Sequence, residues 1–150
     1  MVNNIFKIEN LKVGEGQPPL IVPEIGINHN GSIEVAIKMV DAAKKSGAKI
    51  IKHQTHIPED EMSLEAKKVK PGNSNKNIFS IIKNCSLSEE DEFKLFRYVK
   101  SKKMVFISTP FGKKAVDRLI KFGVNAFKIG SGEFNNIPLL DYISKFKKPL

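Results

Sequence analysis

Short apolar runs of strand length alternate with longer segments of helical periodicity along most of the chain. The strand-like runs cover residues 20–25, 48–52, 104–108 and 124–129, and apolar residues recur every three or four positions in segments 33–43, 88–99, 115–122 and 137–146. Strands that alternate with helices form parallel sheets with right-handed crossover connections. The order of the elements therefore predicts an α/β fold.

A β-hairpin is expected before these units, because Ile5–Ile8 and Leu11–Val13 are short apolar segments joined by Glu9-Asn10. Two architectures suit the alternation, an open doubly wound sheet and a (β/α)8 TIM barrel, and a complete barrel takes about 250 residues. The 150 residues could supply the first four to five units of a barrel, and Lys147–Leu150 leads towards a further strand. We therefore expect a truncated chain that forms the N-terminal part of a barrel.

Several residues are typical of helix ends. Ser32 is an expected N-cap, and Ser88 and Asp91 have the spacing of a capping box. Gly47 and Gly123 follow helical segments, where glycine commonly ends a helix. The mostly polar stretch 53–86 is predicted to be a long loop, and loops of that length are usually functional or disordered.

Polar residues follow all four predicted strands at the end where parallel α/β folds bind their ligands. The segments concerned are 24–31, 52–55, 108–111 and 128–133. Lys52 and Lys128 would place ammonium groups there, and Thr109 and Ser131 would add hydroxyl donors. Together they predict a pocket for a phosphate and a second negative group.

Two carboxylates and three histidines stand close to the same strand ends. Glu24 and Glu133 could act as bases or hold sugar hydroxyls. His29, His53 and His56 lack the i, i+4 spacing of a paired helical metal site. We interpret His29 and His53 as pocket walls or strand-end packing, and expect no metal ligand among residues 1–150.

The net charge of +9, from 25 basic and 16 acidic residues, is carried by lysine pairs scattered over the predicted helix ends and turns. This distribution is typical of solvated surface and argues against a nucleic-acid partner, while a positive field would favour an anionic substrate. The single cysteine, Cys85, excludes a disulfide framework. No apolar run is long enough for a membrane span and no signal peptide is evident, so a cytoplasmic location is expected.

The strand-end motifs, taken together, resemble those of N-acetylneuraminate (sialic acid) synthases. The resemblance runs from about Leu20 to Leu150 and rests on residues 22–31, 51–55, 108–111 and 127–133. Bacterial legionaminic and pseudaminic acid synthases share much of this pattern. The tracts 59–63 and 71–73 favour the neuraminic or legionaminic branches.

The resemblance implies condensation of phosphoenolpyruvate with N-acetylmannosamine, or a close analogue, to a nonulosonic acid plus phosphate. By motif, Lys52, Thr109, Lys128 and Ser131 would hold phosphoenolpyruvate, and Asn73 would contact the amino sugar. Glu24 and Glu133 would orient water or move protons, and the motif leaves open which of them is the base.

The resemblance also implies parts that residues 1–150 lack. A divalent metal, usually Mn²⁺, would have its histidine ligands beyond Leu150, together with the remaining barrel and a C-terminal antifreeze-like domain that reaches into the partner subunit of a homodimer. Two alternatives stay open. One is a non-catalytic, anion-binding half-barrel, and the other is a related synthase with a different acceptor sugar.

Overall fold

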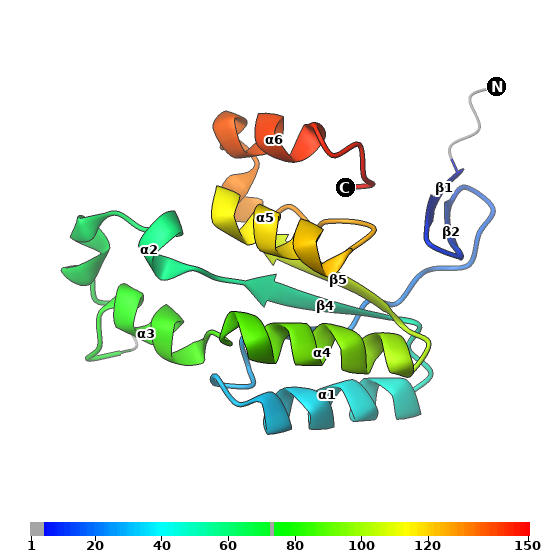
Figure 1. Cartoon of the computed structure of the whole chain (residues 1–150), viewed down its shortest axis with the longest axis horizontal. Coiled ribbons are helices and arrows are strands. Elements are labelled where there is room, and N and C mark those ends of the chain that lie inside the picture. The colour runs from blue at the N-terminus through cyan, green and yellow to red at the C-terminus, as the bar shows by residue number, and fades with distance from the viewer. Residues whose placement is uncertain (1–4, 73) are drawn as a thin grey trace.

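The computed structural model describes residues 5–72 and 74–150, which form two small sheets and a set of helices (Figure 1). Strands β1 (Ile5–Ile8) and β2 (Leu11–Gly14) form an antiparallel hairpin. A parallel sheet contains β3 (Glu24–Gly26), β4 (Ile50–Thr55) and β5 (Val105–Pro110), in that order. The main helices are α1 (Ile33–Lys45), α3 (Ile78–Cys85), α4 (Glu89–Ser101), α5 (Lys113–Phe122) and α6 (Ile137–Ser144).

Four helices pack on one face of the parallel sheet, which decides between the two architectures that the sequence allowed. Their buried residues join those of the strands in one core, whose members include Ile25, Ala36, Val40, Ile51, Leu95, Val99, Phe106, Val116, Leu119, Phe127, Leu139 and Ile143. The opposite face carries a second, smaller core of Ile50, Val105, Ile107 and Ala126, which is covered by Ile8, Leu11, Leu20 and Val22. A doubly wound sheet would bury both faces under helices. Coverage of one face is the arrangement of a section of a β/α barrel.

The predicted strand 124–129 pairs at a single position. Phe127 forms an isolated parallel bridge with Ser108, and the Lys128 N–H donates to the Ser108 carbonyl over 3.1 Å. On its other side the Phe127 N–H donates to the Pro149 carbonyl over 3.0 Å, so the last residues lie beside this segment where a next strand would run. A regular strand was therefore too strong a prediction, because this segment has no full ladder with either neighbour.

The first strand of the parallel sheet is shorter than predicted and starts at Glu24 instead of Leu20. Pro23 has no N–H to give to a ladder, and its carbonyl accepts from the Lys52 N–H over 3.0 Å. Leu20 and Val22 instead lie over the smaller core. The proline thus marks the boundary of the strand.

The stretch 53–86 is not one long loop, contrary to the sequence-based prediction. It contains α2 (Pro58–Glu61), the 3-10 helix η1 (Leu64–Lys67) and α3. Asn77 caps α3 by accepting from the Ser80 N–H over 2.8 Å. The charged and polar residues around the isoleucines of α3 hid its helical pattern. Helices α2 and α3 lie at the carboxyl end of β4, and the hairpin lies at the opposite end (Figure 1).

The predicted helix ends are confirmed. Ser32 accepts from the Val35 N–H over 3.3 Å, and Ser88 accepts from the Asp91 N–H over 3.1 Å. Gly123 follows α5 in the left-handed conformation, with a φ of 87°. Within residues 5–72 and 74–150, none of the helices combines the length and apolar character that crossing a bilayer requires.

Candidate functional site

The strand register places Lys52 and Lys128 on the same face of the sheet. Lys52 pairs in register with Ile107, and Ile107 belongs to the core on the side away from the helices. Phe127 faces the helices, so the next residue, Lys128, points to the other side, because side chains alternate along extended backbone. Since Phe127 bridges Ser108, Lys128 lies level with Thr109 and slightly beyond Lys52 towards the strand ends.

Lys52 is buried and forms an ion pair with a solvent-exposed partner. Its Nζ lies 3.0 Å from Oε2 of Glu24, and the side chains are 5% and 60% exposed. A buried ammonium group needs a negative partner, whereas an exposed carboxylate exchanges readily with water or another anion. A bound anion could therefore replace Glu24 as the partner of Lys52, because water would solvate the exposed Glu24 carboxylate.

Two further polar groups on this face have no protein partner among the described residues. The Thr109 hydroxyl is buried and forms no hydrogen bond with any residue in 5–72 or 74–150. Lys128 is half-buried and forms no ion pair within the described part of the chain. Buried polar groups are nearly always paired, so an unpaired hydroxyl beside an unpaired cation is the arrangement expected where a ligand supplies the missing acceptors.

The segment after Lys128 brings the remaining predicted residues to the same end of the sheet. Ser131 and Glu133 lie in the 3-10 helix η2 (Ser131–Glu133), where Ser131 is exposed and Glu133 is half-buried. The Asn136 amide donates to Oε2 of Glu133 over 2.6 Å and fixes this carboxylate. Asn73, the predicted sugar contact, lies outside the described residues.

A cavity of about 280 Å³ adjoins these strand ends. It is lined by His56, Glu61, Met62, Ile78, Ile82, Phe111 and Glu133. The lining residues come from the ends of β4 and β5, from α2, α3 and η2. The stretch 53–86 therefore supplies one wall of a pocket that Glu133 shares.

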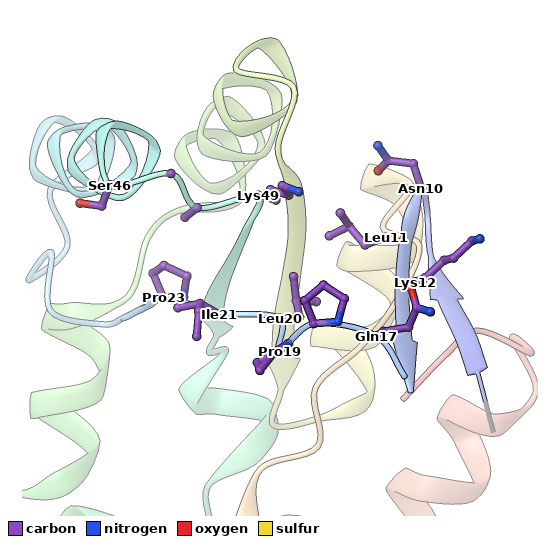
Figure 2. A pocket seen from close by; sticks show the side chains of 13 residues that line it. Asn10, Leu11, Lys12, Gln17, Pro19, Leu20, Ile21, Pro23, Ser46 and Lys49 are labelled. Carbon is purple, nitrogen blue, oxygen red and sulfur yellow. The ribbon is translucent and has the colours of Figure 1, made fainter. Parts of the chain in front are cut away.

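A larger cavity, of about 540 Å³, lies at the other end of the sheet (Figure 2). It opens between the β1–β2 hairpin and the turn from α1 into β4, and Leu11, Pro19, Leu20 and Pro23 line it together with Lys12 and Lys49. Among the residues that the structure describes, no carboxylate or histidine belongs to its lining. In β/α barrels the amino end of the strands serves stability and the carboxyl end serves chemistry. The candidate site is therefore the smaller cavity together with the face that carries Lys52 and Lys128.

A buried polar network on the helix side of the sheet was missed by the sequence analysis. Glu92 of α4 is 1% exposed, and its carboxylate accepts from Arg118 Nη1 over 3.0 Å and from the Thr55 hydroxyl. Its Oε1 lies 3.3 Å from Nδ1 of His53. The signal in the sequence was the position of Glu92, three and seven residues before the buried Leu95 and Val99 on the apolar stripe of its helix.

The hydrogen bonds of the two histidines in this network all run in one direction, from His29 through His53 to Glu92. The Gly31 N–H donates to Nδ1 of His29 over 3.2 Å, so the proton of the neutral ring is on Nε2, which lies 3.2 Å from Nε2 of His53. His53 then carries its own proton on Nδ1 and donates it to Glu92. His29 and His53 therefore pack at the strand ends, one of the two roles predicted for them, and neither belongs to the lining of the smaller cavity.

The environment shifts the pKa values of two of these groups. Burial, followed by the neighbouring His53, lowers the pKa of His29 to about 4, against smaller opposing effects of the Gly26 carbonyl and Glu92. For Glu92, burial raises the pKa, but hydrogen bonds from His53, Thr55 and Arg118 outweigh it and the net shift is downward. At neutral pH, His29 is therefore neutral, and Glu92 is ionised and well paired.

Residues 5–72 and 74–150 contain no cluster of three or more histidine, cysteine or acidic side chains that could hold a metal ion.

The chain is similar to enzymes that make nonulosonic acids. The model of the NeuB family matches residues 39–150. N,N'-diacetyllegionaminic acid synthase of Legionella pneumophila is 35% identical over 149 residues, which cover 96% of this chain and 42% of that protein. Human N-acetylneuraminate-9-phosphate synthase is 30% identical over 141 residues, covering 92% and 39%.

A solved structure supports the same relationship. The N-acetylneuraminic acid (sialic acid) synthetase of Leptospira borgpetersenii superposes with a TM-score of 0.79 at 27% identity, over 94% of this chain and 46% of that one. The chain spans about two fifths of the length of the curated relatives that it matches. The similarity therefore covers one continuous part of those proteins.

Proposed function

The chain belongs to the NeuB family, and from this membership we propose that it forms the first part of the barrel of a nonulosonic acid synthase. Its substrates would be phosphoenolpyruvate and an N-acyl amino sugar such as N-acetylmannosamine. The observation that carries the proposal is the placement of Lys52, Thr109 and Lys128 on one face at the strand ends, with the hydroxyl and one ammonium group unpaired among the described residues. A ligand with a carboxylate and a phosphate would supply partners for the Thr109 hydroxyl and for the ammonium groups of Lys52 and Lys128.

In the proposed reaction, carbon 3 of phosphoenolpyruvate attacks the aldehyde carbon of the open-chain sugar and forms the new carbon–carbon bond. Water adds to the resulting cation at carbon 2, and the tetrahedral intermediate loses phosphate by carbon–oxygen cleavage. Lys52 and Lys128 would offset the negative charges of phosphoenolpyruvate, and Thr109 and Ser131 would donate hydrogen bonds to it.

Glu24 and Glu133 are the two carboxylates available for proton transfer. Glu24 is exposed on the ligand face beside Lys52, and Glu133 lines the smaller cavity while Asn136 fixes it. Either can take a proton from the attacking water or give one to the aldehyde oxygen. Asn73 would contact the sugar from the loop that precedes α3.

No step proposed for residues 5–72 and 74–150 depends on a metal ion. We propose that a Mn²⁺ ion required by the full-length enzyme takes its ligands from residues outside 1–150, and that the full-length enzyme is a cytoplasmic homodimer. The acceptor is the least constrained part of the proposal. Some relatives are named as synthases of legionaminic acid, pseudaminic acid or N-acetylneuraminate 9-phosphate. A different amino sugar, or a sugar phosphate, is therefore an equally compatible acceptor.

The test is a pair of substitutions in the full-length enzyme, Lys52→Ala and Lys128→Ala. Each should weaken transition-state stabilisation by about 2–5 kcal/mol, measured as kcat/KM for phosphoenolpyruvate, because each removes one partner of a charge pair that binding desolvates. Lys49→Ala is the matched control, since Lys49 lies just before β4 and lines the cavity at the opposite end of the sheet. Unchanged phosphoenolpyruvate kinetics in both lysine variants would rule out this anion site.

A panel of amino sugars, each with and without a phosphate group, identifies the acceptor. The sugar with the highest kcat/KM defines the product class. Turnover with none of them would reject the synthase activity itself.

A further inference from the structure

Ser108 extends the buried polar network of Glu92, His53, Thr55 and Arg118, and these five residues are called the Glu92 network below. The Glu92 carboxylate only accepts hydrogen bonds, so the single hydroxyl proton of Thr55 points to Glu92. Oγ of Ser108 lies 2.8 Å from Oγ1 of Thr55 and therefore donates to it. The side chains of Ser108, Thr55 and Glu92 are at most 1% exposed. The direction of each hydrogen bond is thus fixed, from β5 through β4 to α4.

The Glu92 network alternates with the ligand-facing residues along both strands. On β4, His53 and Thr55 contact Glu92 on the helix side, whereas Lys52 faces the other side. On β5, Ser108 joins the network, so the next residue, Thr109, points away from the helices. Lys52 and Thr109 are therefore each joined by one peptide group to a residue of the network.

Ser108 also fixes the backbone of the third ligand-facing residue, Lys128. The Lys128 N–H donates to the Ser108 carbonyl over 3.1 Å, at the bridge between Phe127 and Ser108. Within the described part of the chain, the segment around Phe127 pairs with β5 at this position alone. A displacement of Ser108 would therefore move Thr109 and Lys128 together.

The helix side of the sheet becomes polar at the level of the ligand-facing residues. Ile51 and Phe106, which pair in register and point to the helices, belong to the main core. His53 and Ser108, the next pair that points to the helices, belong to the Glu92 network. The change occurs across Lys52, which is the first ligand-facing residue of β4.

Stability alone does not account for this polarity. The Glu92 network contains an ion pair between Arg118 Nη1 and Oε2 of Glu92, 3.0 Å apart, with side chains that are 14% and 1% exposed. Apolar residues of similar volume often replace a buried ion pair with no loss of stability, because desolvation offsets the attraction of the charges. Hydrogen bonds, however, weaken steeply with changes in distance and angle, so a fully paired network fixes strand positions more precisely than apolar contacts do.

We propose that the Glu92 network positions the anion site, with Thr55 and Ser108 as its positioning residues. Through the backbone of β4 and β5, the network holds the three ligand-facing residues at the separation that one bound anion requires, which is a matter of about 0.5 Å. Thr55 and Ser108 act through their neighbours and do not touch the ligand. The inference rests on the proposed function for the identity of that ligand, phosphoenolpyruvate.

Thr55→Val and Thr55→Ser in the full-length enzyme test the role of the hydroxyl. Valine keeps the shape of threonine, but it removes the donor to Glu92 and the acceptor of Ser108 together. The Kd of phosphoenolpyruvate, from calorimetry, should rise about tenfold, the scale of one lost hydrogen bond. Serine keeps the hydroxyl and should restore the Kd to within about threefold of wild type. Equal Kd values in wild type and Thr55→Val would overturn the proposal.

Val99→Ala is the control for a purely structural effect. Val99 is buried on the same stripe of α4 as Glu92 and lies seven residues further, about 10 Å along the helix, near the amino end of β5. Its truncation should lower the free energy of unfolding, measured with urea, and leave the Kd of phosphoenolpyruvate unchanged. A tenfold rise of the Kd in Val99→Ala as well would show that any loss of core stability weakens binding, and it would overturn the proposal.

Ser108→Ala tests whether the two hydroxyls act by one route. In this variant Glu92 keeps all its donors, so it can be measured even where Thr55→Val does not fold. The Kd should again rise, and the double variant should lose no more than about threefold beyond the larger single effect, because both changes break the same hydrogen bond. Fully additive losses would contradict a common network.

Failure of the proposed function can be distinguished from failure of the network. If Lys52→Ala weakens phosphoenolpyruvate binding and Thr55→Val does not, the network role is rejected and the anion site is kept. If the wild type does not bind phosphoenolpyruvate but binds inorganic phosphate, and Thr55→Val weakens this binding, the synthase is rejected and the network role is kept. Absence of binding of both anions to the wild type rejects both.

Discussion

Single residues of this chain are positioned by hydrogen bonds whose direction can be read from the structure. His29, His53 and Glu92 form a chain in which each imidazole donates in the direction of the carboxylate, and Arg118 compensates the charge of that carboxylate. His56 and Glu61 repeat the principle on the ligand side of the strand ends. In both places a buried carboxylate decides which nitrogen of a histidine is protonated, so these residues are coupled and do not act singly.

The low pKa of His29 makes the stability of the protein depend on pH. In the unfolded chain this histidine titrates near 6.5, and burial lowers its pKa to about 4 in the folded protein, so the unfolded state binds the proton first as the pH falls. The contribution is complete above the unfolded pKa and is lost as the pH falls from about 6.5 to about 4. The free energy of unfolding, from urea titration, should fall by about 2 kcal/mol between pH 7 and pH 5.

His29→Gln is the control for this pH dependence. Glutamine cannot take up a proton in this range, so the free energy of unfolding of the variant should change little between pH 7 and pH 5. The pKa of Glu92 is below its ordinary value, so protonation of Glu92 affects the free energy of unfolding at pH values below this range. An imidazole NMR titration of His29 that gave a pKa near 6.5 would contradict the prediction.

At the scale of elements, the segment 53–86 packs against the loop that follows β3. Gly31 in that loop has a φ of 76°, and a Cβ built on it would lie 2.5 Å from the Asn84 carbonyl oxygen of α3. The Cys85 thiol donates to Oδ1 of Asn30 over 3.7 Å. The end of α3 and the β3–α1 loop therefore touch through backbone, which leaves no room for a side chain.

Gly31→Ala should destabilise the protein more than Gly123→Ala. Both glycines have a positive φ, 76° and 87°, but a Cβ built on Gly123 would meet no other part of the described chain within 4 Å. Backbone strain alone costs about 1 kcal/mol for Gly123→Ala, and the contact with the Asn84 carbonyl should raise the cost for Gly31→Ala to more than about 2 kcal/mol. Urea unfolding of the two variants gives the comparison. Equal losses would mean that the loop and α3 are not in close contact.

At the scale of the whole molecule, the parallel sheet is covered unequally. Residues of four helices cover one face, whereas on the other face Ile8, Leu11, Leu20 and Val22 pack over the smaller core. Glu24, in the edge strand β3, is exposed. Strand β3 lies at one edge, and the last residues lie at the other, beside the segment around Phe127. Open edges of this kind invite pairing with further strands.

The 150-residue chain by itself should yield no nonulosonic acid, even with Mn²⁺ present, while the full-length enzyme should be active. The physical reason is that one wall of the ligand face and the metal site would come from residues outside this chain. Product formation is measured for both proteins under the same conditions, with light scattering to record association of the shorter one. Turnover by the isolated chain would contradict the prediction. A discrete dimer that binds phosphoenolpyruvate without turnover would favour the anion-binding half-barrel instead.

The features that the sequence determined by itself are local ones. The alternation of β3, β4 and β5 with α1, α4 and α5 follows from side-chain periodicity. The caps at Ser32 and Ser88 and the helix end at Gly123 follow from hydrogen bonds within a few residues. The common face of Lys52 and Lys128 depends on alternation along the strands and also on the register, which pairing between distant segments sets.

The tertiary structure decided what depends on contacts between distant segments. Neighbouring residues do not reveal which face the helices cover or why 124–129 pairs at one position. Nor do they reveal how 53–86 folds into helices, or which residues Glu92 and His56 pair with. Glu92 and His53 are far apart in sequence, and no local pattern links a charged residue on an apolar stripe to a histidine in a strand. Burial and pairing of polar groups are properties of the packed chain, since the low dielectric surroundings that make them strong exist only after the core has formed.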